Sequence, residues 1–207
     1  MLKRFCLASC LVLLALPAVA GDLRVRVTEP DGEPVHDAVV SLISDAASGP
    51  VRFSWPMEIV QRDKKFDPFV LVAPAGASVS FPNYDPIRHH VYSFSEAGPF
   101  ELRLYGHGET HQVSFSKVGI VAIGCNIHDS MAAYIYVVDT PYAMKTDEQG
   151  YAVLADVPPG AATLRVWHPQ MRSRDNLVER EAVVATGDAI ESFEVRLRTP
   201  SIQHHAY

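Results

Sequence analysis

The pattern of apolar and polar positions predicts short β-strands along nearly the whole chain. Near the N-terminus, Leu23, Val25 and Val27 alternate with charged residues, which puts alternate side chains on a buried face and in solvent. Further short runs rich in β-branched and aromatic residues follow, separated by turns of Gly, Pro, Asn and Asp. No segment carries a sustained apolar period of 3.6 residues. The sequence therefore predicts an all-β protein.

The character of the expected strands changes twice along the chain. A linker rich in Ala, Ser and Gly occupies residues 44–50, and the strands after it are more apolar than those before it. After Pro141 the strands are again less apolar, like those before residue 44. Short strands at this spacing are typical of a β-sandwich or barrel. We expect strands at residues 23–27, 38–42, 57–60, 69–72, 78–81, 89–94, 100–104, 112–115, 120–123, 132–138, 151–154, 163–167, 181–185 and 193–197.

The first twenty residues are typical of a secretory signal peptide. Lys3 and Arg4 precede an apolar run at residues 5–16, and the sequence at 18–20 supplies the small-residue cleavage pattern. The run is shorter than the roughly 20 apolar residues that cross a bilayer, and no later segment approaches that length. We therefore expect residues 1–20 to be removed, leaving an exported, periplasmic protein without a membrane span.

A lone cysteine would remain after this cleavage. Removal of residues 1–20 discards Cys6 and Cys10 and leaves Cys125 in an oxidising compartment. A competing interpretation, a lipoprotein processing box at residues 7–10, would leave a lipidated Cys10 at the new N-terminus. Metal ligation, a reactive thiol, an intermolecular bridge and an inert buried thiol are the alternatives for Cys125.

The residues that follow Cys125 favour metal ligation. Cys125, His128 and Met131 place a thiol, an imidazole and a thioether three residues apart between two apolar runs. One Cys, two His and a weak axial Met form the ligand set of blue-copper electron-transfer sites. The second imidazole must come from elsewhere, and the pair His89–His90 is the obvious source. Because neighbouring strand residues face opposite ways, only one of that pair can be an ordinary ligand.

Residues 76–131 resemble the cupredoxins, and the short ligand loop is similar to that of the amicyanin group. The whole chain is similar to the periplasmic proteins often labelled methylamine utilisation proteins, which carry a cupredoxin-like domain. The matching motifs are Gly76-x-x-Val79-x-Phe81-x-Asn83, His89-x-Val91 and Gly124-Cys125-x-x-His128-x-x-Met131.

The cupredoxin resemblance implies a single type 1 copper held by four side chains. Cys125 and two histidines would form the ligand plane, with Met131 as the axial ligand. The family pattern selects His89, two residues before a strand valine, and His128 as the loop histidine near the surface. His90 departs from the pattern, which usually has an asparagine there. The candidate metal ligands are therefore His89, Cys125, His128 and Met131.

Other residues are candidates for supporting roles. Asn83 and Asp85 are the candidates for orienting the ligands, although Asn-x-Asp-Pro is also ordinary turn chemistry. The apolar patch expected around the loop histidine consists of Pro86, Ile87, Ile127 and Ala132. His107 and His111 flank a Gly-rich turn and are expected in solvent, and the other remaining histidines lack a ligand companion at useful spacing. The two tryptophans are expected in a core or an interface.

The flanks resemble a carboxypeptidase regulatory-like sandwich of the prealbumin or immunoglobulin type. Residues 22–42 look like its first hairpin, and the motifs Thr146-Asp147-x-x-Gly150-Tyr151 and Val157-Pro158-Pro159-Gly160 look like the remainder. The fold implied is a cupredoxin-like Greek-key β-sandwich inserted in this small sandwich. The domains expected are a signal peptide (1–20), the first part of the flanking sandwich (21–45), the copper domain (46–141), the remainder of the flanking sandwich (142–200) and a tail (201–207).

The resemblance implies a carrier of single electrons with a redox protein partner, such as a cytochrome or a dehydrogenase. A copper carrier or storage module and a metal-free adhesion or assembly module are the alternatives. We expect no catalysis by the chain alone, because copper oxidases and nitrite reductases need further His-rich copper sites. The net charge of −6 is mild and argues against nucleic acid or an anionic membrane as a partner.

Overall fold

The protein is built almost wholly of strands, as the apolar pattern predicts. The computed structural model describes residues 20–46 and 50–198. The predicted signal peptide, apart from Ala20, and the predicted tail at 201–207 lie outside these residues. One short 3-10 helix, Arg174–Asn176, lies among the described residues. Among the described residues, no helix is long and apolar enough to cross a membrane. The predicted all-β class is confirmed.

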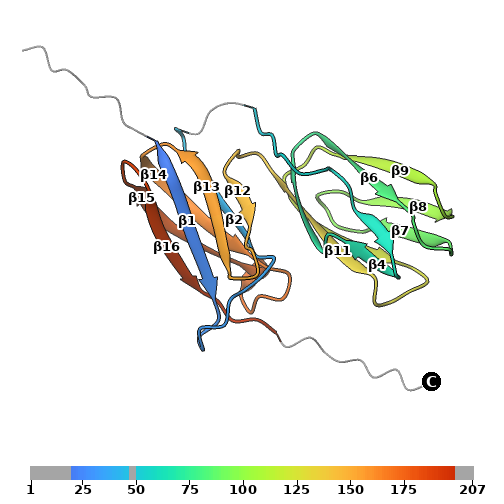
Figure 1. Ribbon diagram of the computed structural model, residues 1–207. Coiled ribbons are helices and arrows are strands. Elements are labelled where there is room, and N and C mark those ends of the chain that lie inside the picture. Colours follow the sequence, from blue (N-terminus) through green and yellow to red (C-terminus); the bar gives the residue numbers. More distant parts are fainter. Residues whose placement is uncertain (1–19, 47–49, 199–207) are drawn as a thin grey trace, which may run out of the picture.

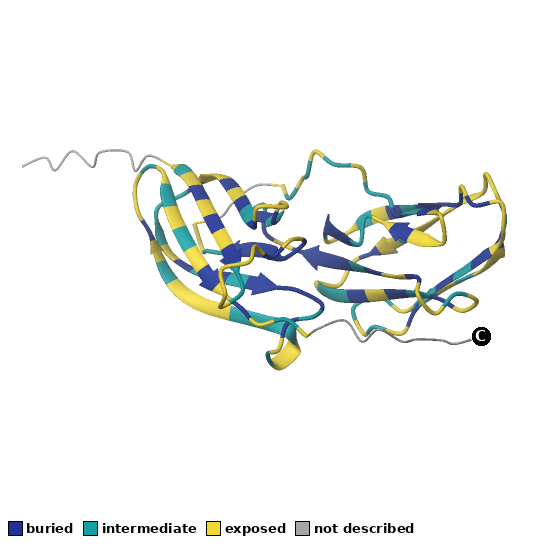
Figure 2. Cartoon of the chain, turned by 60° about the horizontal axis from the view of Figure 1, so that its bottom comes forward, coloured by how far each residue is buried: buried dark blue, intermediate teal, exposed yellow. Residues whose placement is uncertain are grey.

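The strands form two sandwiches that lie side by side (Figure 1). The flanking sandwich packs a three-stranded sheet, in the order β13-β1-β16, against a four-stranded sheet, in the order β12-β2-β14-β15. Along β1 the burial alternates residue by residue (Figure 2). Its strands are β1 (Gly21–Thr28), β2 (Val39–Ile43), β12 (Ala143–Lys145), β13 (Tyr151–Val157), β14 (Gly160–Trp167), β15 (Leu177–Val184) and β16 (Ala189–Glu194).

The central sandwich contains the remaining strands. A five-stranded sheet, in the order β5-β11-β10-β7-β8, packs on the two-stranded sheets β6-β9 and β3-β4 over a shared apolar core. Both faces of β11 carry apolar side chains, because one covers this core and the other faces the flanking sandwich. The strands are β3 (Val60–Arg62), β4 (Lys65–Asp67), β5 (Val70–Pro74), β6 (Ala77–Pro82), β7 (His89–Ser93), β8 (Phe100–Tyr105), β9 (Thr110–Phe115), β10 (Gly119–Cys125) and β11 (Ala132–Val138).

Strands from both ends of the chain build the flanking sandwich. β1 pairs in parallel with β16 and antiparallel with β13, while β2 pairs with β12 and β14. All strands of the central sandwich lie between β2 and β12 in the sequence. This is the pairing that insertion of one sandwich into another produces. The domain boundaries given above stay predictions.

A third apolar cluster joins the two sandwiches. Trp167 at the end of β14 is only 3% exposed and packs against Tyr134 and Tyr136 of β11, with ring centroids 5.6 and 5.5 Å away. Val70 and Val72 of β5 belong to the same cluster. Trp167 is therefore an interface residue, one of the two roles expected of the tryptophans.

The opening segment differs from the expected hairpin. Residues 29–32 do form a turn, in which the Gly32 N–H donates to the Glu29 carbonyl at 2.9 Å. However, β1 and β2 join different sheets, because each finds its partners far along the chain. The expectation that they pair with each other was wrong. The pattern also missed β4 and β12, which have only three residues each and too few positions for a clear alternation.

A buried histidine makes the stability of the fold depend on pH. Burial lowers the pKa of His168, 5% exposed, from its ordinary 6.5 to about 4. Below pH 6.5 the unfolded chain therefore binds a proton that the folded chain does not. We expect stability to fall as the pH drops from 6.5 to 4, by up to about 3 kcal/mol. Urea unfolding of the protein and of His168→Asn, at several pH values, measures this loss.

The asparagine variant is suitable because its amide oxygen can still accept the Gln170 N–H, which donates to His168 Nδ1 at 3.2 Å. Other groups also titrate in this range. The prediction is therefore tested by the difference between the free energies of unfolding of the two proteins at each pH. Parallel stability curves for the two proteins between pH 6.5 and 4 would contradict the prediction.

Candidate metal centre

The loop from Cys125 to Met131 is a closed, tight connection between two core strands. β10 ends at Cys125 and β11 begins at Ala132. The Cys125 N–H donates to the Met131 carbonyl at 3.3 Å, and the Met131 N–H donates to the His128 carbonyl at 3.0 Å. These backbone bonds hold the three potential ligands of the loop at one end of the five-stranded sheet.

His89 reaches the same place from the neighbouring strand. β7 pairs antiparallel with β10, with Val91 opposite Cys125. His89 starts β7, is fully buried, and its Nδ1 lies 3.7 Å from the Cys125 Sγ. His90 turns the other way, where its Nε2 lies 3.0 Å from Glu101 Oε1. The alternation of side chains along β7 thus directs His89 to the thiol and His90 to the outer face.

Two imidazoles and a thiol therefore converge. The donor atoms of His89, Cys125 and His128 all lie within 4.8 Å of one another, and the His128 Nδ1 is 4.0 Å from the Sγ. Metal–sulfur and metal–nitrogen bonds of about 2.3 and 2.0 Å at a trigonal angle put the two donors roughly 3.7 Å apart. The spacing in the protein fits an ion bound between these atoms, and a thiolate with two imidazoles is a donor set that copper accepts.

Asp85 fixes which nitrogen of His89 faces the thiol. Its Oδ2 lies 2.7 Å from His89 Nε2 and also accepts the Lys64 N–H at 3.0 Å. Burial raises the pKa of Asp85, but the hydrogen bonds from His89 and from the backbone N–H groups of Lys64 and Asp63 outweigh it and leave the pKa below its ordinary value. An ionised Asp85 accepts the proton on Nε2, so the Nδ1 lone pair of His89 points towards the Cys125 Sγ.

Asn83 supports this arrangement from one step further away. It is fully buried, its Oδ1 accepts the Asp85 N–H at 2.9 Å, and its Nδ2 donates to the Tyr105 carbonyl at 3.1 Å. Asn83 therefore holds the turn that carries Asp85, and Asp85 contacts the imidazole. Turn chemistry and support of the site, which were alternatives for these residues, are combined here.

The backbone supplies the link between β7 and the cysteine loop. The Asn126 N–H donates to the His90 carbonyl at 3.3 Å. The main chain of His90 thus joins β7 to the cysteine loop. The departure at this position leaves the imidazole of His90 free to contact Glu101.

Met131 closes the loop on the buried side. It is 1% exposed and belongs to the core cluster that contains Cys125. Cys125 itself is 4% exposed and is the one free cysteine among the described residues. A buried thiol with imidazoles on one side and apolar side chains on the other is shielded from water.

One end of the site reaches the surface through His128, which is half-buried. The four residues expected to form a patch around it, Pro86, Ile87, Ile127 and Ala132, are all exposed. Ile87 and Ile127 are 37% and 47% exposed. His107 and His111 are exposed, as their positions beside a glycine-rich turn predict.

Sequence reasoning missed Tyr105, at the end of β8. It pairs with His89 across the sheet, is 2% exposed, and its hydroxyl donates to the Phe81 carbonyl at 2.9 Å. Burial raises its pKa to about 12, and the nearby Cys125 adds to the shift. Its hydroxyl also bonds the buried Gln61. A single tyrosine in a strand of ordinary alternation carries no signal in the sequence.

Comparison with known proteins finds similarity at the level of solved structures. No protein-family model matches the chain. No curated protein sequence matches it either. The solved structures similar to it include the purple cupredoxin of Nitrosopumilus maritimus, at 19% identity and a TM-score of 0.36, covering 39% of this chain and 98% of that one.

Two further similar structures are also cupredoxin folds or contain copper. A copper(I) form of an amicyanin variant is 14% identical with a TM-score of 0.37, covering 48% of this chain and 98% of that one. The copper-containing nitrite reductase of Thermus scotoductus SA-01 is 26% identical with a TM-score of 0.38, covering 55% of this chain and 28% of the reductase. The case for the site therefore rests on this chain's own donor atoms.

Proposed function

We propose that the protein is a periplasmic mononuclear type 1 copper protein that carries single electrons between redox partners. The observation that carries the proposal is the convergence of His89, Cys125 and His128, whose donor atoms lie within 4.8 Å of one another. Met131 would be the fourth ligand, because it ends the same loop and is buried in the same core cluster as Cys125. Bound there, the copper would supply the one-electron redox couple.

The chain's own residues suit electron transfer because they are held in place. Asp85 orients the His89 ring, and the backbone bonds of the loop hold Cys125 and His128. A donor set that moves little between the two oxidation states keeps the reorganisation energy of each transfer low. The half-buried His128, with the exposed Pro86, Ile87, Ile127 and Ala132 proposed as the patch around it, would offer the short path by which an electron reaches a partner protein.

The setting of this function follows from the same proposal. The signal peptide at residues 1–20 would deliver the chain to the periplasm, where a cytochrome or a dehydrogenase would dock on the patch around His128. The proposal assigns no catalysis to the chain. Among residues 20–46 and 50–198, the group of His89, Cys125 and His128 is the one cluster of histidine, cysteine and acidic side chains arranged for a metal.

The test is reconstitution of residues 21–207 with copper(II), followed by a visible spectrum and electron paramagnetic resonance. We expect one copper per chain, an intense visible absorption and the small copper hyperfine splitting of a type 1 site. A copper-loaded, oxidised protein without intense colour would overturn the proposal, as would tight binding of zinc with no stable copper complex. A measured potential and self-exchange rate then separate an electron carrier from a copper delivery protein.

A further inference from the structure

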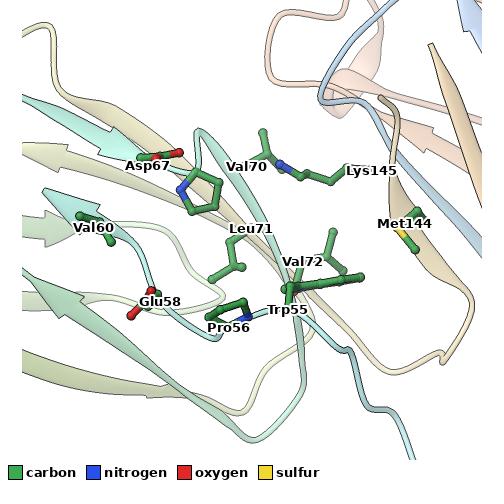
Figure 3. A pocket seen from close by; sticks show the side chains of 11 residues that line it. Trp55, Pro56, Glu58, Val60, Asp67, Val70, Leu71, Val72, Met144 and Lys145 are labelled. Atoms are coloured by element: carbon green, nitrogen blue, oxygen red, sulfur yellow. The ribbon is translucent and has the colours of Figure 1, made fainter. Parts of the chain in front are cut away.

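A second candidate site lies between the two sandwiches, apart from the cysteine loop. A cavity of about 340 Å³ is lined mainly by the segment before β3, by β5 and by β12 (Figure 3). This volume is within the range of small-molecule sites in proteins. β12 belongs to the flanking sandwich and the other elements to the central one. A molecule in this cavity would therefore contact both.

The walls of the cavity are apolar and rigid. Trp55 is fixed on two sides, because its Nε1 donates to the Val72 carbonyl at 2.8 Å and its ring stacks on Phe53 with centroids 4.5 Å apart. Val72 comes from β5, and Met144 faces it from β12. A wall whose aromatic ring is already held in place loses little conformational entropy when a ligand binds.

The cationic side chain at the cavity is paired with a carboxylate, whereas the two acidic side chains are not paired with a cation. Lys145 is neutralised, since its Nζ donates to Asp37 Oδ1 at 2.8 Å. Glu58 and Asp67 line the opposite side in Figure 3. Neither carboxylate has a side-chain hydrogen bond or an ion pair with any other residue that the structure describes. The cavity thus combines an apolar wall with two carboxylates that lack a cation.

We propose that this cavity binds a small organic ammonium ion, with an apolar group about the size of a phenyl ring and one protonated amine. The hydrocarbon part would lie against Trp55, Pro56 and Met144, which are exposed or half-buried, and would remove their apolar surface from water. The ammonium would be placed between Glu58 and Asp67, which supply the negative charge that it needs on leaving water. An anion of the same shape would meet repulsion at these carboxylates.

This binding does not depend on copper, so it can be tested separately from the proposed electron transfer. The probe is 2-phenylethylammonium, titrated into residues 21–207 and followed by calorimetry and by the indole N–H signal of Trp55 in a proton–nitrogen NMR spectrum. We expect a Kd below about 1 mM, a shift of the Trp55 signal, and weaker binding at high salt. The spectrum of a bound copper should not change.

Two isosteres test the chemical class. The neutral 2-phenylethanol should bind at least about tenfold more weakly, and 3-phenylpropionate should not bind measurably. Methylammonium, which has the charge without the apolar body, should also fail to bind. If the alcohol binds as tightly as the amine, the cavity is merely apolar and the proposal is wrong. The proposal also fails if Trp55 does not respond to the amine at about 10 mM.

Charge-removing variants locate the ammonium. Glu58→Gln and Asp67→Asn should each raise the Kd about three- to tenfold, because each removes one carboxylate without changing its shape. Glu194→Gln is the matched control, since it also replaces a carboxylate by an amide, at an exposed position of β16 in the flanking sandwich. Thermal unfolding checks that all three variants fold. Unchanged affinity in both cavity variants would overturn the assignment.

Discussion

The Cys125→Ser variant, loaded with copper(II), lacks the intense visible absorption expected of the native protein. That absorption needs a thiolate bound to the metal, and Cys125 is the one cysteine among the described residues. A serine hydroxyl has nearly the same shape but stays protonated and is a poor ligand for copper(I). We expect the variant to bind copper(II) weakly and to show an ordinary copper signal in electron paramagnetic resonance.

The fold should survive this change, so loss of colour reports on the ligand. Cys125 is 4% exposed, and a buried hydroxyl in its place costs about 1–2 kcal/mol of stability. Circular dichroism and thermal unfolding measure that cost. Ser130→Ala, in the same loop and exposed, is the control and should keep both the colour and the stability. Intense colour retained by Cys125→Ser would mean that the thiolate is not the ligand.

The second large effect distinguishes two adjacent histidines. His89→Ala should lower copper affinity by at least about 100-fold and remove the type 1 spectrum, whereas His90→Ala should keep both. His89 is fully buried with its Nδ1 3.7 Å from the Cys125 Sγ, whereas His90 contacts Glu101 on the outer face. Copper titration followed by visible absorption measures the difference.

Loss of the His89 imidazole also leaves the Asp85 carboxylate buried without its partner, which destabilises the fold. Addition of free imidazole separates the two effects. An imidazole that enters the space left in His89→Ala should restore the colour, because it replaces the missing ligand. If His90→Ala loses the colour instead, the assignment of the ligand is reversed.

Local patterns in the sequence were sufficient to predict most of the strands and the loop from Cys125 to Met131. Cys125, His128 and Met131 are close in the sequence, so their spacing alone placed them on one short connection between apolar runs. The choice between His89 and His90 needed the phase of β7 relative to β10, which depends on pairing between distant segments. Local sequence does not determine that phase.

The features that the sequence did not predict have the same physical origin. The partners of β1 are β13 and β16, which lie far along the chain, and nothing in residues 21–28 specifies them. Tyr105 lies opposite His89 only because β8 pairs with β7. The cavity beside Trp55 exists only because β12 packs near β5. Contacts between segments distant in sequence, rather than residue types, determine these features.

The parallel pairing of β1 with β16 has a consequence for the order of folding. Residues 22 and 188, whose hydrogen bond joins the ends of the flanking sandwich, are 166 positions apart in the chain. The entropy of closing so long a loop must be offset by contacts that form only afterwards. The central sandwich closes much shorter loops and can collapse first, bringing β2 and β12 together. The site that holds the candidate ligands would then form before β1 pairs with β16.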